Sequence, residues 1–183
     1  MKCEWKKVAL GDIVTFSSGG TPHKGTPEYW NGDIPWISAK TMKDEYIKTS
    51  DLFITKEGLL AGSKLAPRGS FLLLTRGSGL FNGIPICYVE EPVAFNQDVK
   101  CLQSKDSSIS NKYVFYWLKS QTDYLKAKLD VTGIGAGKFN MDFLLNLQVP
   151  IPSQTEQAQI VSLADSLTGK IAVNQRINDN LAA

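Results

Sequence analysis

The segment Gln148-Val149-Pro150-Ile151-Pro152-Ser153-Gln154-Thr155-Glu156 divides the chain into a folded body and a long helix. The two prolines keep its first half extended, because proline fixes φ and pushes the preceding residue out of the helical region. Ser153 and Glu156 then form a capping box, in which the serine oxygen accepts a backbone N–H and the glutamate reaches back to the serine N–H. We therefore expect a helix to begin directly after Ser153.

An apolar stripe along this helix predicts a coiled-coil seam. Its mean step is about 3.5 residues, which is the spacing of paired helices. The helix would reach roughly 45 Å, which is more than a small domain needs for its own core. Asparagine in the stripe favours a partner helix, since it fixes register and partner at some cost in stability. The expected interface residues are Ile160, Leu163, Leu167, Ile171, Asn174, Ile177 and Leu181. The alternative is that the part from Ile160 to Leu167 lies on its own domain.

Length and composition indicate a single soluble domain followed by this helix. The 183 residues suit a domain of about 150 residues plus the helix. No apolar run approaches the roughly 20 residues of a membrane span, and no signal-peptide pattern opens the chain. Three widely spaced cysteines and one histidine predict a reducing compartment, no disulfides and no metal site. We expect a cytoplasmic protein without membrane contact.

Short apolar runs and turns fill the middle of the chain, without the regular strand–helix alternation of a parallel sheet. Strands are predicted over 70–75, 84–89 and 93–102, and helices over 55–61 and 110–129. This pattern is typical of an α+β domain with a mainly antiparallel sheet. We expect that domain to occupy residues 1–152 and the helix to occupy residues 153–183.

The sequence contains no recognisable catalytic motif. The glycine-rich loop Gly133–Lys138 lacks the spacing of a phosphate-binding Walker A loop. The segment Arg76–Gly79 lacks the Gly-x-Ser-x-Gly pattern of a nucleophile elbow. The single histidine, His23, lies in a loop without an obvious acidic partner. We predict no catalytic residue and no cofactor site.

Three loops, 21–26, 76–82 and 133–138, have the composition of a nucleic-acid-binding surface. Glycine lets their backbone approach another molecule closely. Their cations can contact phosphate, and their hydroxyls and amides can contact phosphate or base edges. Arg76 is the best candidate for reading a base, because it follows an apolar strand and arginine can bond guanine twice. The predicted DNA contacts are Thr21, Lys24, Lys40, Lys43, Lys64, Arg68, Arg76, Ser78, Asn82 and Lys138.

Two observations limit this hypothesis. The net charge is only +2, so a DNA-binding protein of this composition must gather its basic side chains on one face. Each candidate side chain could also be an ordinary solvated loop residue. The tryptophans have apolar neighbours and are expected in the core rather than stacked on bases; they are Trp5, Trp30, Trp36 and Trp117.

A set of short motifs runs through the whole chain in a fixed order. They are Leu-Gly-Asp-Ile at 10–13, Ser-Gly-Gly-Thr-Pro at 18–22, Tyr-Trp-x-Gly-Asp-Ile-Pro-Trp-Ile at 29–37, Leu-Thr-Arg-Gly at 74–77, Ala-Phe-Asn-Gln at 94–97, the glycine loop at 133–137, and Val-Pro-Ile-Pro at 149–152. Each motif alone is weak, but the ordered set is specific. It resembles the specificity (S) subunits of type I restriction–modification systems.

The resemblance implies a half-length S subunit. Residues up to about 150 resemble one target recognition domain, and the helix resembles the conserved spacer helix of that family. A full S subunit would hold two such domains and read a two-part site in double-stranded DNA. Methyltransferase (M) subunits would carry S-adenosylmethionine and the adenine chemistry, and restriction (R) subunits would join for cleavage. The chain itself would be non-catalytic and would bind no cofactor.

The resemblance leaves the assembly open. With one domain and one helix, the chain is expected to form a homodimer through the helix, to pair with a second half-subunit, or to be the front half of a longer protein. Two other functions also remain: a fragment of a fused DNA methyltransferase, and a helix-mediated assembly module without a DNA role. The missing cofactor motifs argue against the methyltransferase fragment.

Overall fold

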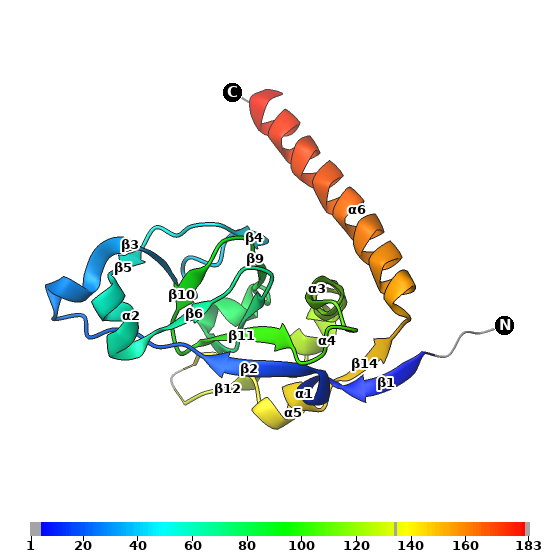
Figure 1. Cartoon of the computed structure of the whole chain (residues 1–183), viewed down its shortest axis with the longest axis horizontal. Coiled ribbons are helices and arrows are strands. Elements are labelled where there is room, and N and C mark those ends of the chain that lie inside the picture. The colour runs from blue at the N-terminus through cyan, green and yellow to red at the C-terminus, as the bar shows by residue number, and fades with distance from the viewer. Residues whose placement is uncertain (1–4, 134, 182–183) are drawn as a thin grey trace.

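A five-stranded sheet carries the hydrophobic core of the computed structural model, which describes residues 5–133 and 135–181 (Figure 1). Its strands lie in the order β2 (Val14–Ser18), β11 (Val99–Ser104), β7 (Phe71–Leu74), β9 (Ile86–Val89) and β4 (Tyr46–Ile47). All its pairings are antiparallel except that of β4 with β9. Every side chain of β7 is fully buried, as a short uninterrupted apolar run predicts.

A second sheet lies beside the first and has its own small core. Its order is β5 (Phe53–Ile54), β3 (Trp30–Ile37), β10 (Val93–Phe95) and β6 (Lys64–Ala66). Only the β3–β10 pairing is parallel. The buried residues Trp36, Ile54 and Ala94 form the core between its strands and helix α2 (Lys56–Gly62). Thr55 caps α2 by accepting the Gly58 N–H at 3.1 Å, which confirms the predicted start of this helix.

Two short sheets join distant parts of the chain. One pairs β1 (Lys6–Ala9) with β14 (Gln148–Ile151) at the base of the long helix. The other has the order β12 (Asp130–Val131), β13 (Gly137–Lys138) and β8 (Arg76–Gly77). Together with the larger sheets, they confirm the predicted α+β class with mainly antiparallel pairing.

Short helices cover the sheets. Helix α3 (Asn111–Ser120) packs against β7 and β9 and buries Phe115 and Leu118 in the core. The remaining short elements are α1 (Leu10–Ile13), α4 (Thr122–Lys126), α5 (Met141–Leu145) and the 3₁₀ turns η1 (Pro27–Tyr29) and η2 (Ser78–Phe81).

The single strand predicted over 93–102 is wrong, because a turn divides it into β10 and β11. The Asn96 carboxamide oxygen accepts the N–H groups of Asp98 at 3.1 Å and of Val99 at 3.2 Å. Asparagine commonly forms such turns with the backbone two residues further on. The turn moves the chain from one sheet to the other.

The single helix predicted over 110–129 is also wrong. It is interrupted at Gln121, which is not helical, and continues as α4 only to Lys126. The hydroxyls flanking the break bond carbonyls of the preceding turn: Ser120 donates to Trp117 O at 2.6 Å, and Thr122 donates to Lys119 O at 2.5 Å. Such local bonds compete with the helical ladder.

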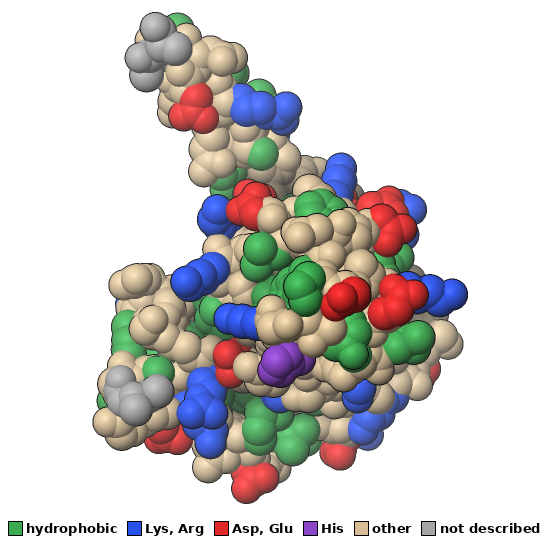
Figure 2. Space-filling model, turned by 90° about the vertical axis from the view of Figure 1, so that its left-hand side faces the viewer, with side chains coloured by type: hydrophobic (Ala, Val, Ile, Leu, Met, Phe, Trp, Pro, Cys, Tyr) green, Lys and Arg blue, Asp and Glu red, His purple; other side chains and the backbone are tan. Residues whose placement is uncertain are grey.

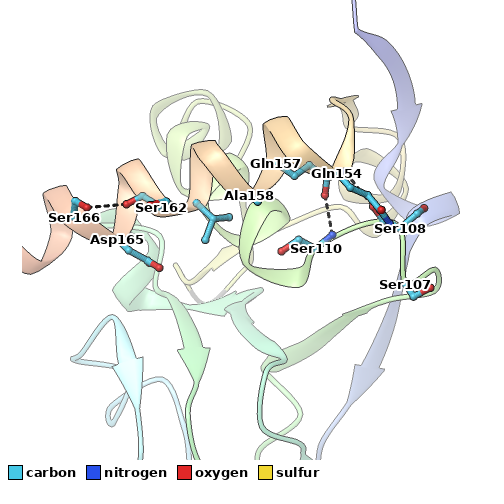
Figure 3. Close-up of a pocket in the computed structure, with 10 residues that line it drawn as sticks. Ser107, Ser108, Ser110, Gln154, Gln157, Ala158, Ser162, Asp165 and Ser166 are labelled. Atoms are coloured by element: carbon cyan, nitrogen blue, oxygen red, sulfur yellow. Dashed lines mark hydrogen bonds between the residues drawn. The ribbon is translucent and has the colours of Figure 1, made fainter.

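Helix α6 (Gln154–Leu181) begins where the capping box predicts. The Ser153 N–H donates to Glu156 Oε2 at 2.8 Å, and the Glu156 N–H donates to Ser153 Oγ at 3.3 Å. Gln157 then fastens the helix to the head, as we call the folded part that precedes α6. Its Oε1 accepts the Ser110 N–H at 2.9 Å (Figure 3). Its Nε2 donates to the carbonyls of Ser108 and Pro152.

Beyond its first turns, α6 leaves the head (Figure 1). Ile160 and Val161 still pack against the core, whereas residues 173–181 are all exposed. No helix in the described ranges combines the length and apolarity needed to cross a membrane. The division into residues 1–152 and 153–183 as functional units remains a prediction.

We expect Gln157→Ala to lower the free energy of unfolding by about 1–3 kcal/mol, because it leaves a buried N–H and two carbonyls without partners. Urea denaturation with an unchanged m-value would measure this loss. Gln159→Ala is the matched control, since Gln159 is exposed on the same helix and its loss should cost less than about 0.5 kcal/mol. Equal losses in the two variants would contradict the anchoring role.

Candidate nucleic-acid interface

A hollow of about 600 Å³, the first hollow, lies between the loop 19–26, the end of β3 and the turn 96–98. Trp30 and Trp36 line it and pack edge to face, with ring centroids 5.4 Å apart. Trp36 is 5% exposed, as predicted for a core tryptophan, whereas Trp30 is only half-buried. The hollow therefore has an aromatic wall under a polar rim.

The same tryptophans hold the loop 19–26 in place. Trp36 Nε1 donates to Gly20 O at 3.1 Å, and Trp30 Nε1 donates to His23 O at 3.3 Å. The Gly20 N–H donates to Phe95 O at 2.9 Å. An added Cβ on Gly20 would lie 1.7 Å from the Gly62 carbonyl oxygen, so only glycine fits here. The loop that carries Thr21 and Lys24 is thus fixed to both neighbouring strands.

A second hollow, of about 180 Å³, adjoins the first. The antiparallel pairing of β8 with β13 places Arg76 opposite Lys138, although the two residues are far apart in the chain. Lys100 of β11 lines the same hollow. Gln97 and Asp98 line both hollows, so the two form one continuous surface.

This surface is basic. Among the residues that the structure describes, Asp98 is the one acid that lines the two hollows. The cations that line them are Lys24, Lys40, Arg76, Lys100 and Lys138. Figure 2 views the molecule from the side of β3 and α2, and Lys and Arg side chains follow one another there beside a recess in the surface. A chain with a net charge of +2 has therefore gathered several cations at one place.

Lys100 is held in a partly desolvated position. Its ammonium donates to Ser18 Oγ and to Gln97 O. Burial lowers the pKa of Lys100, because desolvation disfavours the charged form and the nearby Asp98 offsets this only in part. An approaching phosphate would favour the charged ammonium, so the position suits an anionic ligand.

The structure distributes the other predicted DNA contacts differently. Lys43 pairs with Asp51 at 3.3 Å, and Arg68 pairs with Glu91 at 3.8 Å. Lys64 is exposed on β6, and Ser78 and Asn82 are exposed in and after η2, next to β8. Of the ten predicted residues, Thr21, Lys24, Lys40, Arg76 and Lys138 line the joined hollows. Their contact with DNA remains a prediction.

Sequence reasoning missed three residues of this surface: Asn96, Gln97 and Lys100. They fell inside a predicted strand and were not considered as contacts. The signal that could have found them is Asn-Gln-Asp at 96–98, a cluster of polar residues that interrupts an apolar run. Thr21 Oγ1 donates to Gln97 Oε1 at 2.8 Å, which ties the missed turn to the predicted loop.

The predicted helix stripe faces away from the head for most of its length. Its exposed members are Leu163, Leu167, Ile171, Asn174, Ile177 and Leu181. Ile160 is half-buried and packs against the core of its own head, so the open stripe begins one turn later than predicted. Pairing through this stripe remains a prediction.

The groups that line the two hollows are suited to contact with a nucleic acid. The hollows offer ammonium and guanidinium groups, amides and hydroxyls, which can bond phosphate oxygens and base edges. Within residues 5–133 and 135–181, no group of three or more His, Cys, Asp or Glu side chains is placed to hold a metal ion.

Comparison with known proteins places this arrangement in a family. The model of the family described as "Type I restriction modification DNA specificity domain" matches residues 2–183. The chain is 34% identical over 164 residues to the type I restriction enzyme EcoR124I/EcoR124II specificity subunit of Escherichia coli, covering 88% of this chain and 40% of that protein. It is 29% identical over 188 residues to the MjaIX specificity subunit of Methanocaldococcus jannaschii, covering 97% of this chain and 41% of that protein. The chain thus spans about two fifths of the length of these curated relatives.

Solved structures share the fold. The HsdS subunit from Thermoanaerobacter tengcongensis matches with a TM-score of 0.68 at 19% identity, over 96% of this chain and 40% of that one. The S subunit from M. genitalium matches with a TM-score of 0.59 at 17% identity, over 96% of this chain and 44% of that one. At such low identity, the likeness supports the fold alone: a head of mixed sheets followed by a long helix.

We expect Gly20→Ala to displace the loop 19–26, because its new Cβ would collide with the Gly62 carbonyl oxygen. The loss of unfolding free energy should be about 1–3 kcal/mol or more, as for other overpacked sites. Gly79→Ala is the control, since an added Cβ there meets nothing within 4 Å. Thermal denaturation of both variants would test this, and equal stabilities would contradict the fixed loop.

Proposed function

Because this chain belongs to the family of type I restriction modification DNA specificity domains, we propose that it is a DNA-recognition subunit that contributes one target recognition domain to a restriction–modification complex. The observation that carries the proposal is the pair of joined hollows lined by five cations and one acid. Duplex DNA would contact the head there, with the lysines on phosphates and Arg76 on a base edge.

The proposed role is recognition without catalysis. Methyltransferase subunits would carry S-adenosylmethionine and methylate adenine, and restriction subunits would join for cleavage. The absence of catalytic motifs from the sequence and the names of the relatives support this division of labour. A fused methyltransferase fragment is less well supported, because the relatives named above are specificity subunits. An assembly module without a DNA role would leave the basic hollows unexplained.

A single head would read only one part of a two-part site. The curated relatives are more than twice as long as the matched part. A second head would come from another copy of the chain, from a second half-subunit, or from a further part of a longer protein. We propose that the exposed stripe of α6 pairs with a second helix to bring two heads together, either in a homodimer or with a second half-subunit. The exposure of Leu163, Leu167 and Ile171 supports this, because such a row of apolar side chains gains stability when covered.

We expect the variants of Arg76 and Lys138 to behave differently in DNA binding. Arg76→Ala should cost about 1–3 kcal/mol on the target site and relax the preference at one base pair. Lys138→Ala should weaken binding to all duplexes alike and lower the slope of log K against log salt by about 1. Anisotropy titrations at several salt concentrations would measure both effects.

The target for these titrations comes from sequencing methylated sites after the chain is produced together with its methyltransferase subunit. Lys126→Ala is the matched control, because Lys126 is exposed on α4 and lines neither hollow. If the affinity for duplex DNA, measured in the presence of the methyltransferase subunit, depended on neither salt concentration nor DNA sequence, the proposed function would be contradicted.

Changing Leu167 and Ile171 together to aspartate should abolish pairing through α6, because two charges would have to be buried in an apolar seam. Sedimentation velocity should then report the mass of a single chain. Ser162→Asp with Ala172→Asp adds the same charge at positions that are not three or four residues from any member of the stripe, and should leave pairing intact. An unchanged mass in the Leu167/Ile171 variant would contradict the interface.

A further inference from the structure

A cluster of four side chains, which we call the clasp, joins α6 to the head above Gln157. Asp165 of α6 accepts a hydrogen bond from the Tyr116 hydroxyl at 2.6 Å and forms an ion pair with Lys112 at 2.8 Å; both partners lie on α3. The Tyr46 hydroxyl of β4 lies 2.5 Å from that of Tyr116 and 3.4 Å from Asp165 Oδ1. Figure 3 shows Asp165 pointing from α6 toward the head. Three elements thus meet at one carboxylate.

The charges within the clasp stabilise one another. Partial burial would by itself raise the pKa of Asp165, but the bonds from Lys112 and Tyr116 outweigh it, so the pKa is lowered. The pKa of Lys112 is correspondingly raised, because the carboxylate outweighs desolvation. The Lys112 ammonium also lies 5.5 Å and 5.4 Å from the ring centres of Tyr46 and Tyr88. Both members of the pair are therefore charged at neutral pH.

The clasp lies further along α6 than the polar attachments at the start of the helix. These are Glu156, whose Oε1 accepts the Trp5 Nε1–H at 3.3 Å, and Gln157, which lies about 12 Å before Asp165 on the helix axis. A hollow of about 590 Å³ runs beside the helix over this interval and is lined by small side chains such as Ser110, Ala158 and Ser162 (Figure 3). Ile160 and Val161 pack against the core between Gln157 and Asp165, so the clasp extends the anchored part of α6 and constrains the direction in which the helix leaves the head.

The clasp also connects the helix to the candidate DNA surface. Tyr46 lies in the segment 38–52, and both ends of this segment line the first hollow, at Ser38, Lys40 and Leu52. The Ser50 hydroxyl donates to Trp36 O at 2.8 Å, which fixes one end of the segment to β3. Through Tyr46, the clasp therefore links the direction of α6 to a segment whose two ends line the first hollow.

We propose that Asp165 is a positioning residue that sets the angle between α6 and the head. This angle in turn sets the distance between the two DNA segments that a pair of heads reads; the statement about DNA rests on the proposed function. The free part of the helix acts as a lever. From Gln157 to Leu181 it extends about 36 Å, so a swing of about 10° moves its end by about 6 Å. That displacement equals about two base-pair steps of about 3.4 Å.

The angle can be measured without DNA. Spin labels on cysteines replacing Glu57 of α2 and Asn178 of α6 lie on exposed sites outside the clasp. Cys3 is changed to serine, and Cys87 and Cys101 are buried. Labelled chains diluted in unlabelled protein should give a narrow distance distribution. Asp165→Ala should broaden the distribution of label-to-label distances by about 6 Å or shift its mean by about 6 Å.

Two further variants separate positioning from folding. Tyr116→Phe removes only the hydroxyl that bonds Asp165, keeps the ring volume, and should broaden the distribution to a lesser degree. Asp179→Asn is the control, because it removes a carboxylate from an exposed position on the same helix and should change nothing. Thermal denaturation shows which variants are folded. If Asp165→Ala does not fold, the distance distribution of Tyr116→Phe tests whether the clasp positions the helix. Unchanged distributions in the folded clasp variants would overturn the proposal.

A second arm tests the consequence for DNA. In complex with the methyltransferase subunit, the wild type should methylate two-part sites of one spacing, and Asp165→Ala should also accept spacings that differ by one or two base pairs. A broadened distance distribution with unchanged spacing would overturn the link to DNA. If neither protein directs methylation, the proposed function fails, while the distance measurement still decides whether Asp165 positions the helix.

Discussion

The buried carboxamide of Gln157 is the contact on which the position of the long helix depends. It is 2% exposed and bonds the backbone of two separate segments, the loop before α3 and the end of β14. A buried backbone group that loses its partner costs as much as a lost hydrogen bond, so alternative starting positions for α6 are unfavourable. The pairing of β1 with β14 closes the head just before this point. The helix therefore leaves a rigid base.

The fold separates two surfaces with different chemistry. Cations, amides and hydroxyls gather where the turn 96–98, the loop 19–26 and the paired strands β8 and β13 meet. The apolar stripe of α6 lies elsewhere and faces away from the head. A molecule arranged in this way offers one surface to a polyanion and a separate surface to another helix.

The correct predictions concern features that neighbouring residues decide. The capping box at Ser153 and Glu156 and the cap at Thr55 each involve atoms three residues apart, and both are present in the structure. The errors concern competition between local and distant contacts. The run 93–102 is apolar enough for one strand, but Asn96 bonds its own backbone and directs the two halves into different sheets. The helix 110–129 breaks at Gln121 for a similar local reason that its apolar pattern concealed.

Local patterns were thus sufficient for the α+β class, the start of α6, its apolar stripe, and the family to which the ordered motifs belong. The location of the basic surface required the three-dimensional fold, because Arg76 and Lys138 become neighbours only through a strand pairing across some sixty residues of chain. Packing likewise paired Lys43 and Arg68 with acids, placed Lys100 beside the hollow, and turned Ile160 toward the head. The physical reason is that caps and periodicity depend on bonds within a few residues, whereas a surface depends on which distant segments pack together.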